Sequence, residues 1–114
     1  MPHVVLEYSD GLETQADLQS LCQALFDALA KEPAIPNPAS LKIRACSQPF
    51  GVIGTDPQSY THATLRLLPG RDDATKSHLT GIVLDVMKAH LPEVGSLTAE
   101  AVDMHGASYA KRVL

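Results

Sequence analysis

The sequence repeats one pattern twice: a short apolar strand, an amphipathic helix and a second strand. In the first half, residues 3–8 are rich in β-branched and aromatic side chains, and residues 41–46 alternate apolar and polar ones. Between these segments an apolar stripe at helical spacing covers residues 18–29, and prolines over residues 33–38 separate it from the second strand. The first half therefore predicts a βαβ unit.

The second half shows the same order. Residues 61–68 predict a strand, which the Pro69-Gly70 pair closes. Asp72 and Asp73 then stand where a helix start favours negative charge, ahead of an apolar stripe over residues 79–87. Residues 97–104 complete the unit as a fourth strand.

These patterns predict a single domain over residues 1–114, with pseudo-repeats over about 2–47 and 61–104. A helix between two strands suits a right-handed parallel crossover. We therefore expect an α/β (α+β) fold, in which two consecutive βαβ units form a four-stranded sheet with both helices on one face. A ferredoxin-like plan has the same element order but antiparallel neighbours throughout, and it is the alternative.

Burial of one sheet face leaves the other face open. The residues expected on or beside that outer face include four large apolar side chains, Val5, Leu68, Val102 and Met104. Apolar surface of this kind is usually covered by another subunit. The pattern therefore predicts an oligomer.

Composition limits the class of partner. A net charge of −4 and a pI of about 5.6 argue against a nucleic acid held through its phosphates, whereas a few local cations still suffice to attract a small anion. No stretch approaches the roughly 20 apolar residues of a membrane span, and the first residues lack the pattern of a signal peptide. Cys22 and Cys46 are too few for a disulfide framework. We expect a cytoplasmic protein without a membrane partner.

Pro2 carries the most specific chemistry. Initiator methionine is normally excised before a small residue, and loss of Met1 would leave Pro2 as a secondary amine. An α-amino group has a pKa of about 7.7–8.0, and burial and nearby cations both lower that pKa. A base poised near neutral pH can take a proton from carbon beside a carbonyl. Alternatively, Pro2 only permits excision of Met1 or begins an edge strand.

Three cationic side chains are candidates for binding an anion. Arg71 follows the turn at the end of a predicted strand, and Arg44 lies on the strand face opposite that of Leu41. A guanidinium group binds carboxylates in a bidentate way and can stabilise an enolate. Lys42 shares the face of Arg44. Each of the three could equally be a solvated surface cation or part of an ion pair.

The five histidines do not predict a metal site, because no pair has ligand-like spacing. His78 and His90 lie on one predicted helix but too far apart to share an ion. His62 begins a strand equivalent to the one that His3 begins, so it is either a core or interface residue or a pocket residue.

Several segments, scattered in order along the chain, together resemble the tautomerase superfamily and, within it, the 5-carboxymethyl-2-hydroxymuconate isomerases. Those segments are Pro2-His3, Glu7, Ser9-Asp10, Ala16-Asp17-Leu18, Arg44, His62-Ala63-Thr64-Leu65, Gly70-Arg71 and Ser108-Tyr109-Ala110-Lys111-Arg112.

The resemblance implies a homotrimer of two-βαβ subunits, with a site near the amino-terminal proline at a subunit boundary and without metal or organic cofactor. It implies a carboxylated, enolised muconate as the small anionic substrate. Pro2 would be the acid/base, and Arg44 and Arg71 would bind the carboxylate and 2-oxo groups. Lys42 stands where an arginine occurs in relatives. The loop over residues 47–59 is expected to border the pocket, but it lacks tryptophan.

Two other functions stay open at this point. One is a tautomerase-superfamily reaction on a different small 2-oxo acid, because one scaffold hosts several chemistries. The other is a non-catalytic, ferredoxin-like domain that binds a metabolite. A free proline amine in a closed pocket favours the enzyme.

Overall fold

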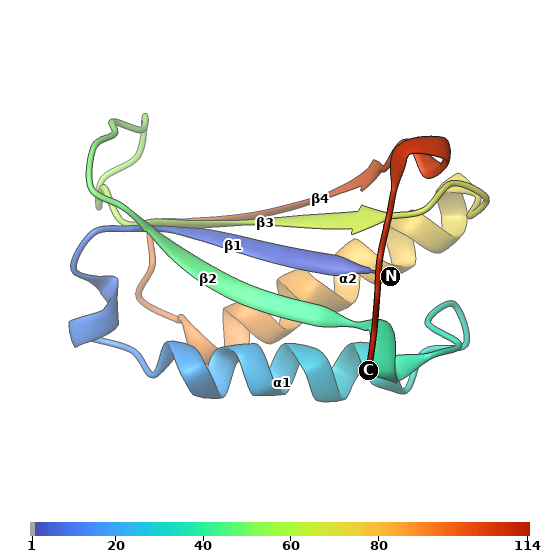
Figure 1. Cartoon of the computed structure of the whole chain (residues 1–114). Coiled ribbons are helices and arrows are strands. Elements are labelled where there is room, and N and C mark those ends of the chain that lie inside the picture. Colours follow the sequence, from blue (N-terminus) through green and yellow to red (C-terminus); the bar gives the residue numbers. More distant parts are fainter. Residues whose placement is uncertain (1) are drawn as a thin grey trace.

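Each half of the chain folds into a βαβ unit, and the two units share one sheet (Figure 1). The computed structural model describes residues 2–114. In chain order its strands and helices are β1 (His3–Ser9), α1 (Leu18–Ala30), β2 (Lys42–Gln48), β3 (Tyr60–Leu67), α2 (Asp73–His90) and β4 (Ser96–Asp103). Short 3₁₀ helices occupy Leu12–Thr14, Pro38–Ser40 and Gly106–Ser108.

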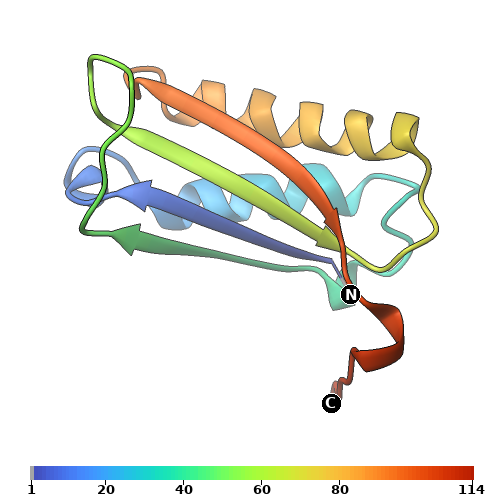
Figure 2. The same cartoon turned by 90° about the horizontal axis from the view of Figure 1, so that it is seen from above.

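The sheet has the strand order β2-β1-β3-β4. Strand β1 is parallel to β2, and β3 is parallel to β4, while the two units meet through the antiparallel pair β1 and β3. Both helices lie against one face (Figures 1 and 2). The two-βαβ expectation is confirmed, and the parallel pairs exclude the ferredoxin-like plan.

The helices begin at acidic caps. Asp17 accepts a hydrogen bond from the Ser20 backbone N–H at 3.0 Å, and Asp72 accepts one from that of Thr75 at 2.8 Å. These bonds satisfy donors that a helix start leaves unpaired. Hydrogen bonds also favour the ionised carboxylates: those from the backbone and side chain of Ser20 lower the pKa of Asp17, and those from the side chain and backbone of Thr75 lower the pKa of Asp72. Asp72, predicted from the sequence as helix-start charge, is thereby a true N-cap.

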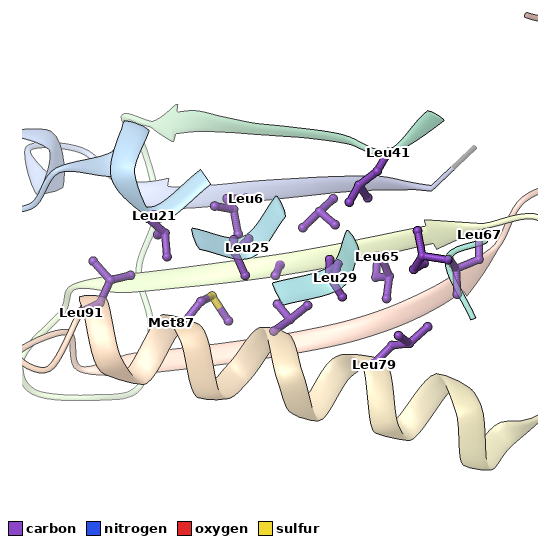
Figure 3. Packing of buried hydrophobic residues seen from close by; sticks show 14 of the residues in the cluster. Leu6, Leu21, Leu25, Leu29, Leu41, Leu65, Leu67, Leu79, Met87 and Leu91 are labelled. Carbon is purple, nitrogen blue, oxygen red and sulfur yellow. The ribbon is translucent and has the colours of Figure 1, made fainter. Parts of the chain in front are cut away.

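Leucine-rich packing between the sheet and the helices forms the core (Figure 3). The stripes predicted on the two helices supply its lower layer, and alternate residues of the central strands supply the upper one. Each completely buried leucine contributes about 1.5–3 kcal/mol of transfer free energy. The fully or almost fully buried members include Val4, Leu6, Leu21, Leu25, Leu29, Leu65, Leu67, Leu79, Val83 and Met87.

The outer face of the sheet is more polar than expected. Val5 and Val102 do lie on it, but Met104 is buried and donates its backbone N–H to the Leu67 carbonyl at 2.6 Å. The expectation of Met104 on an open apolar face is therefore wrong, because its side chain is buried while its backbone N–H continues the hydrogen bonding between β3 and β4 beyond Asp103. The strand registers place these other side chains on the outer face: His3, Glu7, Lys42, Arg44, Cys46, His62, Thr64, Arg66, Thr98 and Glu100.

The topology gathers four segments at one end of the sheet. Strand β1 begins there, the segment over residues 31–41 leads into β2 there, and β3 and β4 both end there, so residues 68–72 and the tail over 104–114 follow. Figure 1 shows both termini at this end and the β2–β3 loop at the opposite end. Among residues 2–114, no helix is long and apolar enough to cross a membrane.

Candidate active site

Pro2 lies in the wall of a cavity of about 180 Å³ at the end of the sheet where β1 begins. Its side chain is buried, and its carbonyl oxygen accepts a hydrogen bond from the Lys42 backbone N–H at 3.0 Å. The walls come from the segment before β2, the turn after β3 and the carboxyl-terminal tail. The lining residues are Pro2, Ile35, Pro36, Asn37, Ser40, Arg71 and Lys111.

Arg71 is held at the cavity by backbone carbonyl groups. Its Nε and Nη2 atoms donate to the Ala34 carbonyl oxygen at 3.1 and 2.8 Å, and Nη1 donates to that of Leu68 at 3.3 Å. A guanidinium group has five N–H bonds, so one N–H on Nη1 and one on Nη2 stay available for a ligand. No carboxylate within residues 2–114 pairs with Arg71. Arg71 is therefore fixed at the cavity with two N–H donors that no protein group accepts from in the hydrogen bonds above.

Local backbone structure explains the placement of Arg71. Gly70 has a φ of 124°, which L side chains rarely adopt, and the turn that it makes brings Arg71 back under the end of β3. The Ala34 carbonyl, which accepts from Arg71 on the other side, belongs to the segment before β2. There the Glu32 carboxylate pairs with the His78 imidazole of α2, and the Ile35 N–H donates to the Glu32 carbonyl at 2.9 Å.

The charge at the cavity is positive. Arg71 and Lys111 are both lining residues, and none of the lining residues is acidic. The Lys42 ammonium lies close by, because it donates to the carbonyl oxygen of Ser40, another lining residue, at 3.0 Å. A larger hollow of about 630 Å³ is lined by Glu32 and Asp72, whose carboxylates would repel an anion. The Pro2 cavity is thus the better site for an anionic ligand.

Arg44 lies outside the cavity lining, on the exposed outer face of β2. Its Nη1 donates to Nδ1 of His3 at 3.1 Å, which leaves the proton of the neutral imidazole on Nε2. That Nε2 lies 3.0 Å from the hydroxyl oxygen of Tyr109. The structure therefore joins Arg44, His3 and Tyr109 in one chain of hydrogen bonds beside Pro2.

His62 lies away from Pro2. It pairs with Glu7 across β1 and β3, four residues along β1 from His3. Its Nε2 contacts the Glu100 carboxylate at 2.7 Å and its Nδ1 contacts the Thr98 hydroxyl at 2.6 Å. Among residues 2–114, no three potential metal-ligating side chains come together.

The pKa of His3 is lowered from its ordinary value of 6.5, mainly by burial and then by the positive charges of Arg44, Lys42 and Arg66. A lowered pKa means that the unfolded chain binds the proton more tightly, so this contribution to stability is present above pH 6.5 and is lost as the pH falls through the folded pKa.

We expect the His3→Gln protein to lose less unfolding free energy than the wild type when the pH falls from 7.5 to 5.5. Urea unfolding at fixed protein concentration measures the unfolding free energy at both pH values. The same loss in the variant as in the wild type would contradict the assignment of this pH dependence to His3.

Two further expectations from the sequence concern the loop over residues 47–59 and the excision of Met1. The loop over residues 47–59 lies at the end of the sheet opposite Pro2, so within one chain it does not border the cavity. Excision of Met1 concerns a residue outside the described range 2–114.

Sequence reasoning missed the carboxyl-terminal contribution to the site. Lys111 lines the cavity and Tyr109 contacts His3, yet the last ten residues show no periodicity from which a strand or helix could be predicted. The available signal was the cluster of tyrosine and cations in that tail. That signal points to the site only because β4 ends at the end of the sheet where β1 begins.

Comparison with solved structures shows the fold. A 5-carboxymethyl-2-hydroxymuconate isomerase from Deinococcus radiodurans R1 superposes with a TM-score of 0.82 at 24% identity, over 97% of this chain and 88% of that one. A 5-carboxymethyl-2-hydroxymuconate delta-isomerase gives 0.84 at 20%, over 99% and 89%. A fused 4-OT wild-type symmetric trimer gives 0.71 at 19%, over 90% and 85%. No curated protein matched the sequence.

The family is shown by the sequence itself. The family model described as 5-carboxymethyl-2-hydroxymuconate isomerase matches residues 2–107, from Pro2 through all four strands. Because this match spans nearly the whole chain and agrees with the fold and with a cavity suited to an anion, the protein is an isomerase that belongs to the 5-carboxymethyl-2-hydroxymuconate isomerase family.

Proposed function

We propose that the protein isomerises 5-carboxymethyl-2-hydroxymuconate, with the amino-terminal nitrogen of Pro2 as acid and base. The observation that carries the proposal is the position of Pro2 in the wall of a cavity that Arg71 and Lys111 also line, two cations that pair with no carboxylate of residues 2–114. An anionic, enolised substrate fits that charge. The same cations disfavour a protonated amine beside them, which leaves more of the amine in its basic form.

The proposed reaction moves one proton within the substrate. The Pro2 amine takes the proton of the 2-hydroxyl group, the C2–O bond becomes a carbonyl, and the electron pair passes along the diene. The Pro2 ammonium then returns the proton to C5, so that the remaining double bond between C3 and C4 is conjugated with the 2-oxo group. No net proton, electron or leaving group is exchanged, so the step requires no redox partner.

The cations have different parts in this proposal. Arg71 binds the carboxylate and the developing oxyanion with its two remaining N–H bonds, since its other donors are fixed on backbone oxygens. Lys42 adds positive charge at the Ser40 side of the cavity. Arg44 is a secondary candidate, because it faces the outer surface of the sheet and reaches the site only through His3. His62 lies too far along the sheet to contact a ligand in this cavity.

We also propose a homotrimer. A 4-OT structure of the same fold is described as a symmetric trimer, and in this chain the outer sheet face is not covered by either helix. That face carries partly buried Val5 and Val102 among polar side chains that already pair with one another, such as His62 with Glu100. Such a surface can be buried in an assembly without leaving those charges unpaired.

The test combines an intact mass with an assay on one sample. The mass shows whether Met1 is absent, and the ultraviolet absorbance of 5-carboxymethyl-2-hydroxymuconate follows its isomerisation. We expect a mass without Met1 together with turnover. A protein without Met1 that fails to turn over this substrate would contradict the proposed substrate. Turnover of a different enolised 2-oxo acid by the same sample would then identify another reaction of the tautomerase superfamily.

A further inference from the structure

We propose that the carboxyl-terminal tail is a second anion-binding arm of the active site, in which Lys111 binds a substrate carboxylate that Arg71 does not reach. Tyr109 is a positioning residue that holds the tail in place through His3. The proposal rests on the proposed function for the identity of the natural substrate, but not for the binding of a dianion. It concerns a segment beyond residue 107, where the family match ends.

Lys111 reaches the cavity from a direction different from that of Arg71. Arg71 comes from the turn after β3, whereas Lys111 comes from the tail after β4, and both are lining residues of the same 180 Å³ space. Within residues 2–114, no carboxylate pairs with the Lys111 ammonium. Its charge is therefore available to a ligand.

The tail is held where it crosses the start of β1. The His3 Nε2–H donates to the Tyr109 hydroxyl at 3.0 Å, and the two rings meet edge to face with centroids 6.0 Å apart and planes at 75°. Arg44 fixes the tautomer that makes this donation, because it donates to Nδ1 of the same imidazole. Tyr109 is partly buried, although its neighbours in the tail are exposed. The anchor lies two residues before Lys111 and next to Pro2.

The chemistry of the substrate requires more than one cation. 5-Carboxymethyl-2-hydroxymuconate carries a carboxylate at each end of a six-carbon chain and a third on its carboxymethyl group. Arg71 has only two N–H bonds free, which suffice for one bidentate carboxylate. Lys111 is a flexible point charge rather than a rigid fork. It suits a carboxylate further from the reacting atoms.

The first experiment measures binding rather than turnover. Adipate is a saturated six-carbon dicarboxylate, and hexanoate is the matching monocarboxylate. We expect the wild-type protein to bind adipate more tightly than hexanoate by titration calorimetry. Lys111→Gln should lower that preference by about tenfold, and Lys111→Arg should keep most of it. Arg112→Gln is the matched control, since it removes a positive charge from the adjacent exposed residue, which does not line the cavity.

The second experiment addresses the anchor. Tyr109→Phe keeps the ring but removes the hydroxyl that binds His3. We expect a smaller loss of the adipate preference than with Lys111→Gln, a raised KM for the muconate and a kcat changed by less than about twofold. A variant that is merely less stable would show a lower melting temperature with the preference intact, and that result would overturn the positioning role.

The outcomes separate this proposal from the proposed function. Equal losses for Lys111→Gln and Arg112→Gln, or no loss for Lys111→Gln, would overturn the arm. If Lys111→Gln alone loses the adipate preference while the wild type fails to isomerise the muconate, the arm stands and the substrate assignment falls. If the wild type turns over the muconate and Lys111→Gln keeps both its KM and the preference, the function stands and the arm falls.

Discussion

Replacing Pro2 with Ala should lower kcat for the muconate by roughly 100- to 10,000-fold, the range of general acid–base catalysis. Alanine at this position still permits excision of the preceding methionine and leaves an amine, but a primary one without the ring that fixes its direction. Its backbone carbonyl can still accept the Lys42 hydrogen bond. The substitution should therefore slow the chemical step without destabilising the sheet. Steady-state absorbance assays of kcat and KM would measure the effect.

A matched control separates the amine from the side chain. A form that carries one additional residue ahead of Pro2 keeps the proline ring but converts its nitrogen to an amide, which cannot accept a proton at neutral pH. Both variants should lose turnover while their far-ultraviolet circular dichroism and oligomeric state stay unchanged. Full turnover by the extended form, after an intact mass has shown that the additional residue is present, would remove the Pro2 nitrogen from the mechanism.

The fold could be predicted because its signals are local. Apolar residues at helical spacing became the buried stripes of α1 and α2, and the acidic residue at position 72 became a cap with a hydrogen bond to Thr75. Element ends shifted by one or two residues: β2 runs to Gln48 rather than 46, because its register with β1 continues to the pair Ser9 and Gln48. Such pairing involves another part of the chain, which periodicity does not report.

The site could be predicted only in part, for the same reason. Pro2 and Arg71 each stand at the end of a strand, so the topology alone puts them at one end of the sheet. Tyr109 contacts His3 across 106 residues of sequence, and nothing near either residue indicates that contact. The apolar members of the outer sheet face predict an open apolar surface, whereas its polar members pair across strands, as His62 does with Glu100.

Replacing Arg71 with Ala should lower kcat/KM by about 100- to 1,000-fold, the usual effect of removing a donor that stabilises an oxyanion. The change also leaves the Ala34 and Leu68 carbonyl groups without this donor, which should cost about 1–3 kcal/mol of unfolding free energy. A stability loss alone could therefore imitate a catalytic one. Thermal unfolding, and assays at temperatures well below the transition, keep the two effects apart.

Arg71→Lys distinguishes binding geometry from charge. A lysine ammonium has three N–H bonds on one atom, so it cannot serve the Ala34 carbonyl, the Leu68 carbonyl and a bidentate carboxylate at once. We expect Arg71→Lys to recover only a small part of the lost kcat/KM, whereas Arg112→Ala, which removes an arginine outside the cavity lining, should behave as wild type. Near-complete recovery by lysine would show that Arg71 supplies charge alone. A wild-type kcat/KM for Arg71→Ala would mean that its hydrogen bonds to the two carbonyl groups are its whole role, and that the anion is held by Lys111 and Lys42.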